Sequence, residues 1–425
     1  MVTPQLKEKD LGLRDFLQLQ KQQALEERAT TFTAFSDEAR RRGANTYARM
    51  VVSPADRKVV IQDPFSGKLR AMLMFASNNY LGLANHPYVK EKVKAAIDKF
   101  GVGLGGPPLL NGYTRLMSEL EARLAALKKK PAALVFSSGY GANLGLISAL
   151  VKENDRVLYD ELSHASFHDG LRMAKARADS FAHNDLTQLE ALLKADGKKS
   201  LNLFVGVEGV YSMDGDMAPL DKIVELCHRY GAFLWLDDAH GTGILGEHGG
   251  GTAEEHGVEE SIDLSMGTFS KAFAVTGGFL AASREIIEYI RYFARPYVFS
   301  AALPPVLLAA VLAGLDVLEQ EPERRTELRN ISQYAAEKLR PFGLTVDPQA
   351  AIIAIRVPEW MNIRRANYLI HQRGIFLNAI EFPAVPENQQ RFRISLMVNH
   401  TKEDVDLLAA VLEEVWDLER KLIKG

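Results

Sequence analysis

The chain has 425 residues, 47% hydrophobic and 25% charged, which is ordinary for a folded protein and long enough for two or three domains. A formal net charge of −3 argues against the strongly basic surface that binds nucleic acid or an anionic membrane. The single cysteine, Cys227, excludes an internal disulfide and a cysteine-cluster metal site, and it suits a reducing cytoplasm.

Residues 1–65 are predicted to form a charged, helical arm that ends at the turn signal DPFSGK. The arm lacks the apolar stretch of a secretory signal peptide, so we expect a cytoplasmic protein. No window approaches about 18 uninterrupted apolar residues, so no transmembrane span is expected. Peripheral contact with a membrane stays open.

Residues 66–300 alternate between short apolar runs and helical stretches. The apolar runs predict strands at 132–136, 155–160, 201–207, 233–238, 262–268 and 277–283. They are apolar on both faces, which is typical of a mostly parallel sheet covered by helices. Helical periodicity lies between them, at 186–196 and 220–231. We therefore expect a large α/β domain built on a doubly wound, mostly parallel sheet.

Residues 301–425 have a different texture. A long helix is expected at 304–322, strands at 351–358 and 391–398, and a closing helix capped by Thr401. This pattern predicts a smaller α+β domain at the C-terminal end of the chain.

Unusual polar residues follow several of the predicted strands of the large domain. Ligands of open α/β sheets bind at the carboxyl ends of the strands. The residues at such ends are Ser138, Gly139, His164, Asp237, His240 and Lys271. Because they recur at successive strand ends, we expect them to form one site.

Lys271 lies in the stretch GTFSKAFAVTGG, residues 267–278, which is otherwise small or apolar. One interpretation is a lysine whose ammonium reaches water from the end of a strand. The other is a lysine that forms a covalent bond, since burying an unpaired ammonium is costly. Pyridoxal 5′-phosphate (PLP) needs a lysine, a carboxylate for its ring nitrogen and a phosphate seat at a helix N-terminus. The stretch SSGYGANLG, residues 137–145, is suited to such a phosphate-binding site. It lacks the lysine of a loop that binds a nucleoside triphosphate.

Metal binding is the alternative for two of these motifs. HASFH, residues 164–168, spaces two histidines as a metal pair, but no nearby Glu or Cys completes a ligand shell. Asp237 and Asp238 are also compatible with helix capping or Mg²⁺ binding. PLP uses all the strand-end groups together, so we expect PLP and no metal.

The combined motifs resemble those of the α-oxoamine synthases, the fold-type-I PLP enzymes that join an amino acid to an acyl thioester with loss of CO2. The resemblance covers about residues 45–420. The motifs that carry it are FASNNYLGLANHP (75–87), FSSGYGANLG (136–145), DELSHASFHDG (160–170), EGVYSMDGD (208–216), DDAHGTGILGEHGGG (237–251), GTFSKAF (267–273), FSAALPP (299–305) and RISLMVNHT (393–401).

The resemblance implies a role for each matching residue. Lys271 bonds to the cofactor and later acts as base and acid at the α-carbon, while Asp237 pairs with the ring nitrogen. His240 and Ser212 contact the ring hydroxyl, and His164 stacks on the ring. The phosphate contacts implied are Ser138, Gly139, Tyr140, Thr268, Ser270 and, from the partner subunit of a homodimer, Ser300. Asn78 and Arg393 are implied to bind the substrate carboxylate.

The resemblance implies an amino acid and an acyl-CoA or acyl carrier protein as partners. FSKAFAVTGGF, FPAVP and RISLMVNHT are similar to bacterial serine palmitoyltransferases, which favours serine and sphingolipid synthesis. HGTG is similar to 8-amino-7-oxononanoate synthases, which use alanine, and a glycine-using synthase is a further alternative. Pro107 and Pro108 depart from the small residue and Arg or His of relatives, which leaves the specificity open.

Two alternative functions are an aminotransferase and a non-catalytic subunit. An aminotransferase of the same fold would share Lys271 and Asp237, although the DDAH and GTG motifs favour the synthase. A non-catalytic subunit would be expected to lose the lysine, which this chain retains.

Overall fold

The computed structural model describes residues 23–41, 47–62, 67–197 and 199–424. The helices are α2 (Leu25–Arg41), α3 (Pro87–Phe100), α4 (Arg115–Leu127), α5 (Gly139–Leu150), α6 (Ala165–Ala174), α7 (Leu186–Asp196), α8 (Leu220–Tyr230), α9 (Thr252–Glu255), α10 (Arg284–Phe293), α11 (Arg295–Val298), α12 (Pro305–Gln320), α13 (Glu323–Leu339), α14 (Ile363–Gln372) and α15 (Lys402–Lys424). The strands are β1 (Met50–Val51), β2 (Lys58–Gln62), β3 (Leu69–Met74), β4 (Ala132–Phe136), β5 (Arg156–Asp160), β6 (Arg177–Phe181), β7 (Leu203–Glu208), β8 (Phe233–Asp237), β9 (Leu264–Thr268), β10 (Gly278–Ala282), β11 (Ile352–Arg356), β12 (Ile375–Phe376), β13 (Asn378–Ile380) and β14 (Arg391–Ser395).

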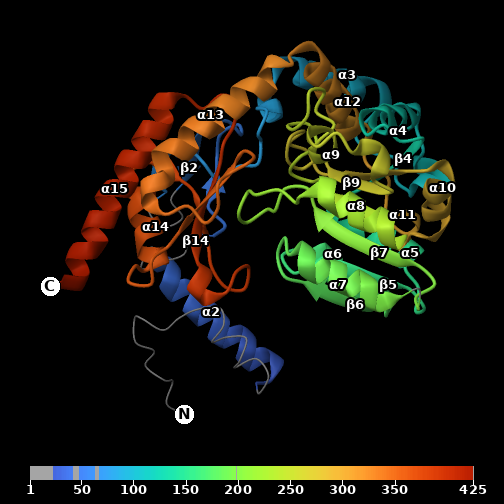
Figure 1. Ribbon diagram of the computed structural model, residues 1–425. Helices are drawn as coiled ribbons and strands as arrows, with labels where there is room; N and C mark the ends of the chain where they lie inside the picture. Colours follow the sequence, from blue (N-terminus) through green and yellow to red (C-terminus); the bar gives the residue numbers. More distant parts are fainter. Residues whose placement is uncertain (1–22, 42–46, 63–66, 198, 425) are drawn as a thin grey trace.

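A seven-stranded sheet forms the centre of the larger lobe, on the right of Figure 1. Its strand order is β4-β10-β9-β8-β7-β5-β6, and every strand is parallel to its neighbours except β10, which is antiparallel to both β4 and β9. The six predicted strands of this sheet are confirmed. The seventh, β6, was not predicted because its residues are mostly polar and it lies at the edge of the sheet.

Helices cover both faces of this sheet, as a doubly wound fold requires. Trp235 and Leu264 belong to the core on one face, where α5, α6, α10 and α11 pack. Leu234 and Leu236 alternate with Trp235 and belong to the core on the other face, under α7 and α8. Because both faces are buried, strands such as β8 read as continuous apolar runs.

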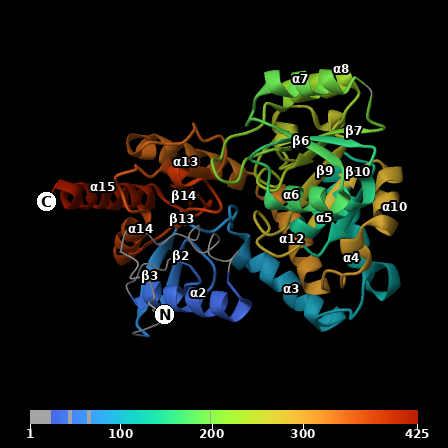
Figure 2. The ribbon, with the colours of Figure 1, turned by 90° about the horizontal axis from the view of Figure 1, so that it is seen from below.

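The smaller lobe holds two further sheets and lies on the left of Figures 1 and 2. One is four-stranded, in the order β1-β2-β3-β12, and the other is three-stranded, in the order β11-β14-β13. Both strands predicted in this part of the chain, β11 and β14, are confirmed. The closing helix α15 is capped as predicted, since the Thr401 hydroxyl accepts a hydrogen bond from the Asp404 amide at 3.3 Å.

The prediction of a wholly helical arm over residues 1–65 is wrong for residues 50–62, which contribute β1 and β2. Residues 1–22, 42–46 and 63–65 of this arm lie outside the described residues. Val59 and Ile61 of β2 pack with Met72 and Met74 of β3 against Met397. β2 pairs with β3 across the expected boundary at residue 65, and β3 pairs with β12 near the other end of the chain. In the described part of the chain, no helix is long and apolar enough to cross a membrane.

Candidate active site

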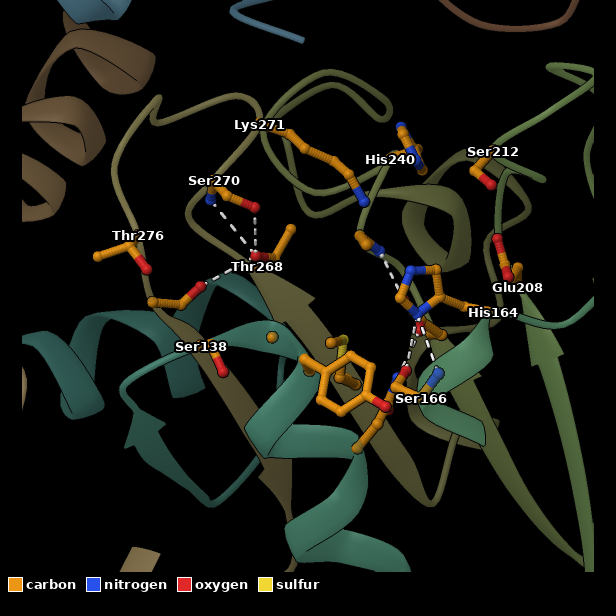
Figure 3. Close-up of a pocket in the computed structure, with 17 residues that line it drawn as sticks. Ser138, His164, Ser166, Glu208, Ser212, His240, Thr268, Ser270, Lys271 and Thr276 are labelled. Atoms are coloured by element: carbon orange, nitrogen blue, oxygen red, sulfur yellow. Dashed lines mark hydrogen bonds between the residues drawn. The ribbon is translucent and has the colours of Figure 1, made fainter. Parts of the chain in front are cut away.

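A cavity of about 280 Å³ opens at the carboxyl ends of β4, β5, β7, β8 and β9 (Figure 3). Ten of the predicted site residues line it, namely Ser138, Gly139, Tyr140, His164, Ser212, Asp237, His240, Thr268, Ser270 and Lys271. The residues that line it without having been predicted include Asn143, Ser166, Glu208 and Thr276. Parallel strands bring their carboxyl ends to one edge, which explains how residues from separate motifs meet here.

Asp237 ends β8 and is 3% exposed. Its Oδ2 accepts a hydrogen bond from Asn143 Nδ2 at 2.7 Å, and its Oδ1 accepts one from the Ala239 amide at 3.1 Å. Asn143 also donates to Ser166 Oγ at 2.9 Å. These hydrogen bonds hold the Asp237 carboxyl group in a fixed position at the cavity.

The N-terminus of α5 forms another wall of the cavity. Ser138 caps this helix, since its Oγ accepts a hydrogen bond from the Gly141 amide at 2.9 Å. A side chain at Gly139 would bring its Cβ to 2.9 Å from Thr268, so the helix can approach β9 only with glycine there. The Thr268 hydroxyl lies 2.9 Å from that of Ser270. Free amides and hydroxyls around a helix N-terminus form an anion site suited to phosphate.

Lys271 extends into the cavity from the loop after β9 (Figure 3). Burial and the positive charge of Arg393 lower the pKa of Lys271 to about 8, although Asp237 and Glu208 act in the opposite direction. The ordinary value for lysine is near 10.4. A larger fraction of this amine is therefore neutral at physiological pH, as a nucleophilic lysine requires.

His240 is buried next to Tyr80, a residue that was not predicted as part of the site. The Tyr80 hydroxyl lies 2.7 Å from His240 Nδ1. Burial lowers the pKa of His240 well below its ordinary value and raises that of Tyr80 to about 12. Both groups are therefore neutral at physiological pH. The contact between them is a hydrogen bond between neutral groups and not an ion pair.

Arg393 and Asn78 are not among the described residues that line the cavity. Arg393 is 4% exposed and donates to the Ser212 carbonyl at 2.5 Å and to Asn78 Oδ1 at 3.1 Å. The structure therefore brings the two predicted carboxylate contacts together. It also joins them to Ser212, which does line the cavity.

Three other predicted residues have different surroundings. His164 caps α6, and its Nδ1 lies 2.8 Å from Ser166 Oγ. Tyr140 is 42% exposed, meets the His164 ring edge-on and bonds through its hydroxyl to Asp169. Ser300 does not line the cavity of its own chain, as far as the described residues show.

Neither metal alternative finds support in the described residues, which contain no group of three or more His, Cys, Asp or Glu side chains able to hold a metal ion. His168 packs edge-on against Tyr159. Asp238 is fully buried and bonds to Lys128 Nζ at 2.6 Å. That ion pair, rather than Mg²⁺, neutralises the second carboxylate of the DDAH motif.

Comparison with known proteins gives the family. A profile described as aminotransferase class I and II matches residues 70–412. An 8-amino-7-oxononanoate synthase from Thermosipho melanesiensis is 37% identical over 380 residues, which cover 89% of this chain and 95% of that protein. A putative 8-amino-7-oxononanoate synthase from Acetivibrio thermocellus is 41% identical over 339 residues, 79% of this chain and 87% of that one.

The solved structure of a serine palmitoyltransferase from S. paucimobilis with bound PLP is similar over 93% of this chain and 99% of its own, with a TM-score of 0.87 and 29% identity. The chain belongs to the aminotransferase class I and II family, as an α-oxoamine synthase. The resemblance expected from the motifs and the fold-type-I architecture are thereby confirmed.

PLP is the cofactor of this synthase, and the cavity fits it on its own chemistry. It combines a lysine of lowered pKa, a buried carboxylate and a hydroxyl-lined helix N-terminus. The carboxamide oxygen Asn143 Oδ1 and the carboxyl oxygen Glu208 Oε1 are buried and without a hydrogen-bond partner in the described residues. Buried polar atoms normally have partners, so these atoms indicate that a polar molecule completes the site.

Proposed function

We propose that this chain condenses alanine with an acyl thioester, releasing CO2 and the free thiol, as an 8-amino-7-oxononanoate synthase. The observation that carries this proposal is the 37% to 41% identity to relatives of that name, over 79% to 89% of the chain. The serine palmitoyltransferase that it resembles in structure is 29% identical. The preference for serine expected from FPAVP and RISLMVNHT is therefore replaced by alanine.

The product name of these relatives identifies the substrates by their carbon skeleton. Carbon 7 is a ketone, carbon 8 carries the amine and carbon 9 is the terminal methyl group. Carbons 8 and 9 are therefore the two carbons that alanine keeps after it loses its carboxylate. Carbons 1 to 7 then come from a seven-carbon dicarboxylic acyl thioester.

The proposed roles follow from the positions of the side chains. Bound PLP supplies an electron sink that makes the α-carbon of the amino acid nucleophilic. Lys271 removes and returns the proton at that carbon, which its pKa of about 8 permits. Asp237 holds the ring nitrogen in its protonated form, and the helix N-terminus at Ser138 holds the phosphate together with Gly139, Tyr140, Thr268 and Ser270. His164 covers the ring and excludes water.

The remaining roles concern the amino-acid end of the cavity. Arg393 and Asn78 bind the substrate carboxylate, for which Arg393 has the planar donor arrangement. His240 and Ser212 contact the ring hydroxyl of the cofactor. His240 is held for this by Tyr80, whose hydroxyl lies 2.7 Å from its Nδ1.

The enzyme is proposed to act in the cytoplasm as a homodimer in which Ser300 completes the cavity of the partner subunit. Ser300 follows Phe299, which is 72% exposed, and the nearby Leu110 is 81% exposed. The two segments are joined by a hydrogen bond from the Ala302 amide to the Gly106 carbonyl, at 2.9 Å. Exposed apolar side chains gathered on one surface are typical of an interface.

An amino-acid and acyl-thioester panel tests the substrate proposal. We expect the PLP-loaded protein to prefer alanine over serine and glycine by at least about tenfold in kcat/KM, with a seven-carbon dicarboxylic thioester preferred over palmitoyl-CoA. The reverse order, serine with the long monocarboxylic chain, would instead establish a serine palmitoyltransferase. Glycine as the best substrate would also reject the assignment.

A further inference from the structure

Glu208 and Asp237 are two buried carboxyl groups at the ends of adjacent strands. They are paired in the register of β7 and β8, and the Gly209 amide donates to the Asp237 carbonyl at 2.8 Å. Each is 3% exposed, and each lines the cavity. In Figure 3, Glu208 lies on the same side of the cavity as Ser212 and His164.

The two carboxyl groups differ in their hydrogen bonds. Both oxygens of Asp237 accept hydrogen bonds, from Asn143 and from the Ala239 amide. Glu208 has hydrogen bonds to the backbone of His164 and Ser212, but its Oε1 is buried and has no partner within the described part of the chain. A protonated carboxyl group has an O–H to donate, and the unpartnered oxygen of Glu208 is free to meet a bound molecule.

The surrounding charges agree with this assignment. Burial, followed by the negative charge of Asp237, raises the pKa of Glu208 well above its ordinary value, while Lys271 acts in the opposite direction. Lys271 has a pKa of about 8, and its charge interacts with both carboxyl groups. The negative charge of Asp237 therefore favours the neutral form of Glu208.

We infer that Glu208 is a further binding group of this site, a neutral carboxylic acid that donates its proton in a hydrogen bond to an oxygen of the bound molecule. Since Glu208 lies beside Asp237, the favoured acceptor is an oxygen on the cofactor ring rather than on the amino acid. The inference rests on the proposed pairing of Asp237 with the cofactor. Glu208 opens the motif EGVYSMDGD, but no role was predicted for it from the sequence.

Two substitutions separate a neutral acid from an anion. Glu208→Gln keeps a donor and an acceptor without a charge, and Glu208→Met keeps the length without either. The dissociation constant for PLP is measured by titrating the apoprotein. The pH dependence of the visible absorption of the loaded protein reports the charge around Lys271, and spectral titration gives the affinity for alanine.

For Glu208→Gln we expect a PLP dissociation constant within about twofold of wild type and an unchanged pH midpoint. For Glu208→Met we expect PLP to bind about fivefold more weakly, the equivalent of one neutral hydrogen bond. If Glu208→Met weakens alanine instead, the acceptor oxygen belongs to the amino acid and the carboxylic-acid donor is still supported.

Two results would overturn the inference. A midpoint displaced by a full pH unit or more in Glu208→Gln would show that Glu208 carries a charge. Unchanged affinities for both PLP and alanine in Glu208→Met would show that it binds neither. Should the Met variant fail to fold, Glu208→Ala replaces it in the same titrations.

Glu419→Gln is the matched control. Glu419 is another fully buried carboxyl group, which pairs with Arg365 far from the cavity, in α15. It should leave both affinities and the pH midpoint unchanged. None of these titrations requires turnover. The inference on Glu208 can therefore be rejected while the amino-acid panel supports the proposed function, and the proposed function can be rejected while the titrations support the inference.

Discussion

Lys271 is the residue whose surroundings determine the chemistry of the site most directly. Burial and Arg393 lower its pKa to about 8, and only the neutral amine can bond to the aldehyde of PLP. We therefore predict that the rate of PLP capture by the apoprotein rises about tenfold per pH unit below pH 8 and levels off above it. Stopped-flow absorbance at saturating PLP measures this rate.

A midpoint near pH 10 would contradict the desolvated setting of Lys271. The variant Asp237→Asn tests the direction of the shift, because the Asp237 charge raises the pKa of Lys271. Removing that charge should move the midpoint to lower pH.

Arg393 is predicted to bind the carboxylate of the amino acid. A hydrogen bond to a charged group contributes about 1.5–3 kcal/mol, so Arg393→Ala should weaken alanine binding by about ten- to a hundredfold. Spectral titration of the loaded enzyme measures this affinity. Arg356→Ala, an exposed arginine on the neighbouring β11, is the control. Equal alanine affinity in wild type and Arg393→Ala would exclude the role.

Several elements of the large lobe are joined by His183, which follows β6. Its Nδ1 lies 3.1 Å from Asp160 Oδ1 at the end of β5, and its Nε2 lies 2.7 Å from Asp216 Oδ2. Asp216 belongs to the loop that carries Ser212, so His183 fixes one wall of the cavity. Burial opposes its charge, but the hydrogen bonds to both carboxylates raise the pKa of His183 to about 10.

The folded-state pKa of His183 is above its unfolded value of about 6.5, so its stabilisation is full below pH 6.5 and is lost as pH rises through about 10. His183→Gln should lower the free energy of unfolding by about 2 kcal/mol at pH 6 and much less at pH 10. Urea unfolding at both pH values tests this, with the exposed His228→Gln as control. An equal loss at both pH values would show that charge is not involved.

The sequence predicted elements whose signal is local and missed those that depend on distant partners. β8 and β9 are apolar on both faces, which marks a buried parallel strand wherever it pairs. β3 pairs with β2 nearby in the chain, but on its other side it pairs with β12, about three hundred residues later. That contact leaves no periodic pattern in either segment.

The same distinction holds for the site. Asp237 was found because it follows an apolar run, and Glu208 carries an equal signal at the end of LFVGVE that was overlooked. Asn143 and Tyr80 had no such signal. Their roles arise from packing, since Asn143 reaches Asp237 from the first turns of α5 and Tyr80 reaches His240 from the segment between β3 and α3.

At the scale of the whole molecule, the proposed homodimer predicts how the exposed apolar surface around Phe299 behaves. Phe299→Glu places a charge in an interface, where it would have to be desolvated, and should shift the protein from dimer to monomer. Sedimentation velocity of the full chain measures the change. Activity should fall with the dimer, because Ser300 would no longer complete the neighbouring cavity.

Leu201→Glu is the matched control, since Leu201 is 77% exposed on a loop that precedes β7. It should leave the association state unchanged. A wild-type protein that sediments as a monomer at assay concentrations and is fully active would contradict the dimer.

The central claim is decarboxylative condensation, and the ratio of its products tests it most directly. The PLP-loaded enzyme is incubated with carboxyl-labelled alanine and the seven-carbon dicarboxylic acyl thioester, and CO2 and free thiol are counted in the same reaction. We predict that they appear one to one, and only when both substrates are present. Conversion of alanine to its 2-oxo acid without release of thiol would show an aminotransferase and contradict the account.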